Sequence, residues 1–160
     1  MPPPKPFQLD RSVTHRLHTL SKLTDRETQR AYLAEEGITL SEGRCLAAVG
    51  AFGPLSVNDL AGHANLDKGQ ASRAAQSLVQ QGLVLKEAVP TDGRGVLLSL
   101  SAEGTKRWRR LQALIARRNA EITSCLSAQE RRSFDALLDR LIADARARAV
   151  ESSEGTLDSD

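Results

Sequence analysis

The sequence predicts a mainly helical α+β protein with six helices and one two-stranded β-hairpin. Helix start signals recur along the chain, long apolar stripes of helical period lie near both ends, and one Gly-rich turn separates two short apolar runs. Only 3% of the 160 residues are aromatic, so the core must be built mainly from Leu, Ala, Ile and Val, which favours helices. A chain of this length can bury its core as one domain without disulfides or a metal.

Five helix starts are marked by side chains that can accept a hydrogen bond from the unpaired backbone N–H groups of a first turn. Two of them have the S/T-x-x-E form of a capping box, two are looser versions, and one is a lone Ser. In chain order, these starts are Thr39, Ser56, Asp67, Ser101 and Ser127. A further helix over about residues 9–35 brings the expected number to six.

Apolar stripes mark the helices near the two ends of the chain. The helix over 9–35 carries Val13, Leu17, Leu20 and Leu23 along one side. The helix from about 102 to 126 is striped through Trp108, Leu111, Ile115, Ile122 and Leu126, and the last helix through Phe134, Leu137, Leu138, Leu141, Ile142 and Ala145. This apolar surface favours self-association, most simply as a twofold dimer. Alternatively, these helices cover a single monomeric core.

Residues 54–100 have the pattern of a winged helix-turn-helix: a short helix, a turn, a second helix and two strands. In the second helix, an apolar set recurs at helical spacing and should face inward, with Gly82 as the C-terminal cap. The inward set is Ala71, Ala74, Ala75 and Leu78, and the outward set is Lys68, Gly69, Gln70, Ser72, Arg73 and Gln76.

The outward set of this second helix is small, polar and basic, as expected of a helix that enters a DNA major groove. Arg73 can donate a bidentate pair to guanine, and Gln70 can pair in the same way with adenine. Ser72 and Lys68 are better suited to phosphates. The alternative is that these residues are ordinary solvent-facing side chains.

A hairpin follows directly, with strands expected at 83–89 and 96–100 and a Gly-containing turn at 90–95. Arg94, at its tip, is long enough to enter a minor groove. Asp92 can hold that guanidinium by a charge-assisted hydrogen bond. The alternative is a simple salt-bridged turn, although its position directly after a helix-turn-helix favours the DNA-binding interpretation.

The net charge of +2 conceals an uneven distribution. Glu151, Glu154, Asp158 and Asp160 all lie in the last ten residues, where there is no Lys or Arg, so the remainder of the chain carries +6. This basic body suits an anionic partner such as DNA. We expect residues 1–6 and the acidic tail 149–160 to be disordered, because neither has much to bury.

Several classes of protein are disfavoured by what the sequence lacks. The longest stretch without a charged residue, residues 45–58, is too short for a bilayer span of roughly 20 residues, and no signal peptide is visible. No phosphate loop, nucleophile elbow or metal motif is present, so we expect neither an enzyme nor a cofactor nor a metal. Two cysteines half a chain apart suit a reduced, cytoplasmic protein.

The order of these pieces resembles the MarR family of bacterial transcriptional regulators. The resemblance covers roughly residues 7–148 and is specific because several short motifs occur in order at suitable distances. The motifs are Thr39-Leu40-Ser41, Leu60-Ala61, Asp67-Lys68-Gly69-Gln70-Ala71-Ser72-Arg73, Gln81-Gly82-Leu83-Val84, Asp92-Gly93-Arg94 and Leu100-Ser101-Ala102-Glu103-Gly104.

The resemblance implies a homodimer that binds a pseudopalindromic DNA operator, commonly as a repressor that a small molecule releases. Dimerisation helices at 7–36 and 101–148 would flank a DNA-binding lobe at 37–100. The implied DNA contacts are Lys68, Gln70, Ser72, Arg73, Gln76, Lys86 and Arg94, with Arg94 braced by Asp92. Lys86 stands where family members often carry Arg, which keeps the charge but loses the planar bidentate geometry.

The resemblance also implies an effector site between the dimerisation helices and the DNA-binding lobe, often for an aromatic or phenolic carboxylate. An anion would want Arg or His, and a ring would stack on Trp. The candidates are His15, Arg16, His18, Arg44 and Trp108. Alternatively, the histidines lie on a solvated face and the Trp belongs to the core.

A thiol redox switch is the alternative mode of regulation, with Cys45 or Cys125 as the sensor. Reactivity would need an exposed thiol of lowered pKa. Peroxide sensors in the resembling family typically place the sensing Cys in the first helix, where this chain has none. Cys45 precedes an apolar run and is expected to be buried.

Overall fold

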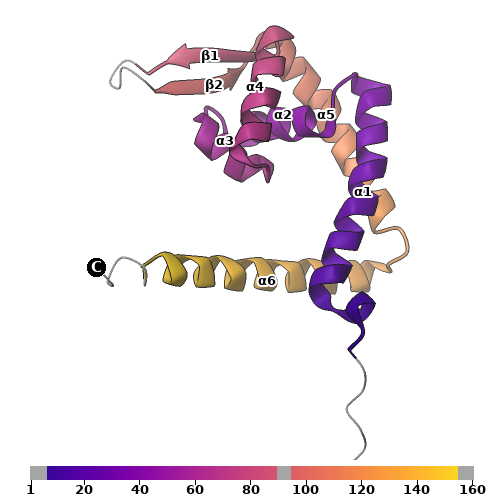
Figure 1. Cartoon of the computed structure of the whole chain (residues 1–160). Coiled ribbons are helices and arrows are strands. Elements are labelled where there is room, and N and C mark those ends of the chain that lie inside the picture. Colours follow the sequence, from indigo (N-terminus) through magenta and orange to yellow (C-terminus); the bar gives the residue numbers. More distant parts are fainter. Residues whose placement is uncertain (1–6, 90–94, 155–160) are drawn as a thin grey trace, which may run out of the picture. The chain divides into compact units, whose positions relative to one another are not determined.

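The computed structural model describes residues 7–89 and 95–154, which contain six α-helices, a short 3-10 turn and one two-stranded antiparallel sheet (Figure 1). The helices are α1 (Val13–Glu36), α2 (Leu40–Phe52), α3 (Val57–Ala64), α4 (Lys68–Gln80), α5 (Ala102–Ile122) and α6 (Ala128–Glu154). The strands are β1 (Val84–Ala88) and β2 (Val96–Leu100), and the 3-10 turn is η1 (Leu9–Arg11). The predicted fold class is confirmed.

All five predicted N-caps act as caps. Thr39, Asp67 and Ser127 each form a reciprocal capping box with the residue three positions later. The Ser56 hydroxyl accepts from the Asp59 N–H at 3.1 Å, and the Ser101 hydroxyl accepts from the Gly104 N–H at 2.9 Å. Each cap satisfies an N–H group that the first turn of a helix leaves unpaired, so local chemistry fixes where these helices begin.

The C-terminal ends of α3 and α4 set the direction of the motif. Asn65 and Gly82 follow these helices in the left-handed conformation, with φ of 52° and 71°. The Leu66 N–H then donates to Ala61 O at 3.1 Å, and the Leu83 N–H donates to Leu78 O at 2.9 Å. These are Schellman-type endings, which turn the chain sharply from α3 into α4 and from α4 into β1.

Two compact units divide the chain within α5, at residues 1–118 and 119–160. In the first unit, Figure 1 shows α2, α3 and α4 gathered at the base of the β1–β2 hairpin. Strand pairing runs from Val84 opposite Leu100 to Ala88 opposite Val96. Leu55 forms an additional bridge with Leu98, so the hairpin is joined to the chain that leads into α3.

Helices α1 to α5 and both strands contribute side chains to the core of the first unit. Its fully buried side chains include Leu46, Leu60, Leu78, Leu98 and Leu111. Aromatic rings from α1 and α5 lie over glycines of α2: a Cβ at Gly43 would stand 2.2 Å from the Tyr32 ring, and one at Gly50 would stand 2.6 Å from Trp108. The long helices α1 and α5 therefore approach α2 closely.

The first helix is displaced slightly from its predicted bounds. η1 occupies the predicted beginning, and α1 starts after Ser12, whose hydroxyl accepts from the His15 N–H. Figure 1 shows the N-terminal half of α1 running clear of the α2–α4 group. Its apolar stripe is accordingly open, with Leu17 52% and Leu20 49% exposed.

The second unit is dominated by α6. The side chains of this unit are described up to Glu151, and none of them is buried. Leu137, Leu141 and Ile142 are exposed. The helix runs to Glu154, whereas the sequence placed its end at 148. An Arg148–Asp144 ion pair one turn apart lies in the part of α6 just before this extension. The remaining residues of the predicted tail, 155–160, and the predicted disordered start, 1–6, lie outside the described residues.

Candidate nucleic-acid interface

Helix α4 divides into an apolar and a polar side, as the sequence predicted. Its apolar set, Ala71, Ala74, Ala75 and Leu78, is buried, and the five predicted contact residues Lys68, Gln70, Ser72, Arg73 and Gln76 are exposed. Three of these four inward residues are alanines, whose small side chains let the helix axis lie close to the core while the polar residues stay in solvent. In the described part of the chain, neither Lys68 nor Arg73 forms an ion pair, so both charges are available to an anionic partner.

Arg73 lies over the first turn of α4. A Cβ placed on Gly69 would stand 3.3 Å from the Arg73 Nη1 atom and 3.3 Å from the Asp67 Oδ1 atom. The guanidinium therefore adds its charge near the helix N-terminus, where the backbone N–H groups already favour an anion. Gly69 leaves the room that this arrangement needs.

Gln70 also belongs to the cap of α4, and this role limits how its side chain could contact adenine. Its side-chain Oε1 accepts from the Asp67 N–H at 3.3 Å, and its own N–H donates to Asp67 Oδ1 at 2.7 Å. A bidentate pair with adenine needs both the oxygen and the nitrogen of the amide. Gln70 would have to release the cap to read adenine in this way.

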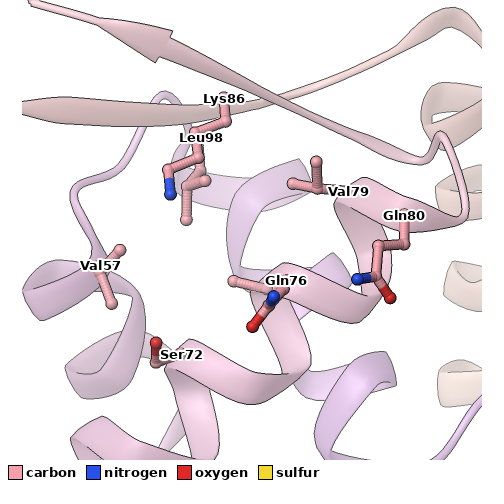
Figure 2. Close-up of a pocket in the computed structure, with 8 residues that line it drawn as sticks. Val57, Ser72, Gln76, Val79, Gln80, Lys86 and Leu98 are labelled. Carbon is pink, nitrogen blue, oxygen red and sulfur yellow. The ribbon is translucent and has the colours of Figure 1, made fainter.

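A hollow of about 400 Å³ lies between α4 and the hairpin. Figure 2 shows Lys86 extending from β1 towards the space beside α4 where Ser72 and Gln76 lie. The full lining is Val57, Ser72, Ala75, Gln76, Val79, Gln80, Lys86 and Leu98. Three residues predicted separately from the helix and the strand thus share one surface.

A second hollow, of about 310 Å³, lies on another side of α4. It is lined by Thr39, Ser41, Glu42, Gln70, Arg73, Ala74 and Ser77. Burial by itself would raise the pKa of the Glu42 carboxyl, but hydrogen bonds from Ser77, Thr39 and Gln81 together hold that pKa below its usual value. Glu42 therefore stays ionised next to a basic helix. The sequence marked it only as a capping partner of Thr39.

A family model and a curated relative match this arrangement. The MarR family model covers residues 36–95, from the end of α1 to the turn before β2. HTH-type transcriptional repressor Rv2887 from Mycobacterium tuberculosis is 29% identical over 114 residues, which are 71% of this chain and 82% of that protein. Over these residues, the chain is similar to the MarR family.

Solved structures of MarR regulators have the same fold. Rv2887 of Mycobacterium tuberculosis in complex with salicylic acid superposes with a TM-score of 0.69 at 26% identity, over 82% of this chain and 97% of that one. The PcaV regulator of Streptomyces coelicolor in complex with its natural ligand gives a TM-score of 0.72 at 28% identity, over 88% and 98%. The chain thus shares its fold with MarR regulators, two of which were solved in complex with small ligands.

The sequence predicts that Asp92 and Arg94 form the tip of the hairpin. Both lie outside the described residues, so their pairing stays a prediction. Next to this turn, the Val89 N–H donates to Gly95 O at 2.9 Å. That bond closes the base of the hairpin and fixes where its tip begins.

The residues predicted to bind an effector are spread over three helices. Arg44 of α2 pairs with Asp25 of α1 at 2.6 Å, each side chain being about one-third exposed. Trp108 of α5 is half-buried against Gly50. His15, Arg16 and His18 are exposed on the N-terminal half of α1, and none of the five lines either hollow beside α4. Sequence reasoning missed Asp25, which holds Arg44 from 19 residues away.

The two cysteines differ in environment. Burial, reinforced by the negative charge of Glu42, raises the pKa of Cys45 to about 12, which argues against it as a sensor. Cys125 is exposed in the turn between α5 and α6. Within the described ranges, no three His, Cys, Asp or Glu side chains converge as metal ligands, and no helix there is long and apolar enough to cross a bilayer.

We predict that a thiol reagent modifies only one cysteine of the native protein. At pH 8 a thiol of pKa about 12 is ionised in roughly one molecule in ten thousand, so Cys45 should stay unreacted until the protein unfolds. Counting modified thiols by mass spectrometry before and after denaturation should give one and then two. In Cys125→Ser, the native count should fall to zero. Rapid native modification of Cys45 would contradict its burial and restore Cys45 as a candidate redox sensor.

Proposed function

We propose that this protein is a transcriptional regulator of the MarR family, a homodimeric, sequence-specific DNA-binding protein that represses transcription from a pseudopalindromic operator until a small effector binds. The main support is the exposed side of α4, where Lys68 and Arg73 carry charges with no partner in the described part of the chain. Repression follows the name of the mycobacterial relative. Such a protein acts on the chromosome and is expected in the cytoplasm.

The DNA contacts are divided between bases and phosphates. Arg73, near the start of α4, reaches guanine in the major groove, while Lys68 and Ser72 bind phosphates. Gln76 and Lys86 extend the surface towards the hairpin, in the hollow shown in Figure 2. Gln70 contributes its amide N–H, because its oxygen serves the cap. Arg94, braced by Asp92, reaches the minor groove.

The dimer is proposed to form through the apolar stripes of the long helices. Val13, Leu17 and Leu20 recur at i, i+4 and i+7 on α1 and are all largely exposed, a costly arrangement for an unpartnered helix. A second copy of the chain supplies a self-complementary cover by twofold symmetry. The two α4 helices would then read half-sites about one DNA turn apart, roughly 34 Å.

The proposed effector is a small aromatic carboxylate. A relative in this family is known in complex with salicylic acid. Arg44 is the best candidate for the carboxylate, since its present partner Asp25 is a carboxylate that a ligand can replace. Trp108 offers a ring for stacking, and His15, Arg16 and His18 are further candidates on α1.

We predict that Arg73→Ala weakens binding to the DNA upstream of the protein's own gene by about 1–3 kcal/mol and relaxes base preference. Fluorescence anisotropy over a range of salt concentrations measures both effects. Arg109→Ala is the matched control, because Arg109 is also exposed but lies on α5. Equal losses in the two variants would reduce the role of Arg73 to net charge. A wild-type protein with no salt-sensitive DNA binding would refute the proposed function.

Leu17→Asp should convert the dimer into a monomer, because it places a charge in the middle of the proposed apolar interface. Light scattering coupled to size exclusion gives the molar mass directly. Lys22→Asp, on the opposite side of α1, should leave the dimer intact. A monomeric wild-type protein, or a dimeric Leu17→Asp variant, would be inconsistent with this interface.

Salicylate should change the intrinsic fluorescence, since Trp108 is the one Trp of the chain and belongs to the proposed effector site. Arg44→Ala should abolish the response by removing the cation that binds the carboxylate. Asp25→Asn should preserve or strengthen it, because it frees Arg44 without removing it. If Arg44→Ala responds like the wild type, the anion is bound elsewhere.

A further inference from the structure

The carboxylate of Glu42 joins α2 to the recognition helix. Its Oε2 accepts from the Thr39 N–H at 2.7 Å and completes the cap of α2. Its Oε1 accepts from the Ser77 hydroxyl at 2.5 Å and from Gln81 Nε2 at 3.1 Å. Gln81 Nε2 also donates to the Ser77 hydroxyl at 3.1 Å, so the three side chains form a closed network. We call Glu42, Ser77 and Gln81 the α2–α4 clasp.

The clasp acts on the same face of α4 that reaches towards DNA. Gln70, Arg73, Ser77 and Gln81 follow one another at i, i+3, i+7 and i+11, which places them along one stripe of the helix. The first two belong to the proposed reading surface, and the last two are held by Glu42. Any rotation of α4 about its axis therefore moves both halves of the stripe together.

The buried face of α4 has few large side chains that could fix its rotation. Three of its four buried residues are alanines, Ala71, Ala74 and Ala75, and only Leu78 is large. Methyl groups form shallow, weakly directional contacts. Hydrogen bonds to a charged carboxylate are stronger and depend on angle.

We propose that Glu42 is a positioning residue for DNA recognition, which fixes the rotation of α4 through Ser77 and Gln81 and so directs Arg73 into the groove. The inference rests on the proposed function, because it assumes that α4 reads DNA. Glu42 itself touches no base or phosphate in this role. Its effect passes through α4.

A purely electrostatic role for Glu42 would have the opposite effect on DNA affinity. Glu42 and Arg73 line the same hollow of about 310 Å³, so the carboxylate can repel nearby phosphates. Removing its charge would then tighten binding to every DNA sequence. Under the positioning role, removing the clasp loosens specific binding and leaves nonspecific binding unchanged.

The test uses two variants that break the clasp and one that spares it. Glu42→Gln keeps an amide oxygen for the Thr39 N–H, as Gln70 does for Asp67, but turns an N–H donor towards Ser77 and Gln81. Ser77→Ala removes the central hydroxyl. Thr39→Ala weakens only the cap of α2 and leaves the clasp intact. Circular dichroism and thermal unfolding establish that each variant is folded.

We expect Glu42→Gln and Ser77→Ala each to lower affinity for the upstream DNA about tenfold, as loss of hydrogen bonds to a charged group implies. The double variant should lose no more than either single variant. Nonspecific affinity and the salt slope should stay unchanged, and Thr39→Ala should change binding less than twofold. Tighter binding of Glu42→Gln to all DNA, or additive losses in the double variant, would overturn the proposal.

A DNA-free measurement separates this inference from the proposed function. Hydrogen exchange of the α4 amides in the full-length protein should be about tenfold faster in Glu42→Gln and Ser77→Ala than in Thr39→Ala. Unchanged exchange in both clasp variants would refute the clasp even if the wild type binds DNA. Faster exchange together with a wild type that binds no DNA would refute the proposed function, and with it the positioning role.

Discussion

The structure depends on how closely α4 packs against α2 and α3. Three alanines on its inner side let the helix axis approach the core, where Leu46, Leu60 and Leu78 are fully buried. Larger inward residues would push the helix outward and tilt its polar side. Because the inward side chains of α4 are small and lie close to the core, the outward side chains can all be polar without weakening the packing of the core. The close packing that stabilises the lobe also presents Lys68 and Arg73 to solvent.

Contacts of the small inward side chains fix the distance of α4 from the core but not its rotation about its own axis. The rotation therefore depends more on the contacts at the two ends of the helix. At its start, the Asp67–Gln70 capping box sets the first turn. At its end, the Ser101 hydroxyl donates to Gly82 O at 2.6 Å, and a Cβ on Gly104 would stand only 1.8 Å from Leu83 O. The chain that leaves α4 is therefore fixed to the beginning of α5. The end of α4 and the start of α5 therefore cannot move independently.

The fold was predictable because its signals are local. Caps act over three residues and stripes over one or two helical turns, so Thr39, Ser56 and Ser127 could be read directly from the sequence. Contacts between distant residues carry no such pattern: Ser77 meets Glu42 across 35 positions. Sequence reasoning accordingly identified the exposed side of α4 and the cap at Asp67, but not the clasp. The sequence also ended α6 too early, because the residues from 149 onward have little to bury and suggested a disordered tail, whereas the helix continues to Glu154.

Control by an effector requires that α1 influence α4, and the first unit contains a continuous set of contacts for this. Gln29 of α1 accepts from the Leu40 N–H at 2.5 Å, at the start of α2, and Asp25 of α1 pairs with Arg44 of α2. Glu42, in the same turns of α2, reaches α4. A ligand can shift such an arrangement only by binding one state more tightly than another. In the proposed mechanism, an effector that replaces Asp25 as the partner of Arg44 would supply that difference, because the bound anion would free α1 to move relative to α2. In the proposed dimer, which would engage two half-sites at once, a small change in either lobe would weaken both contacts.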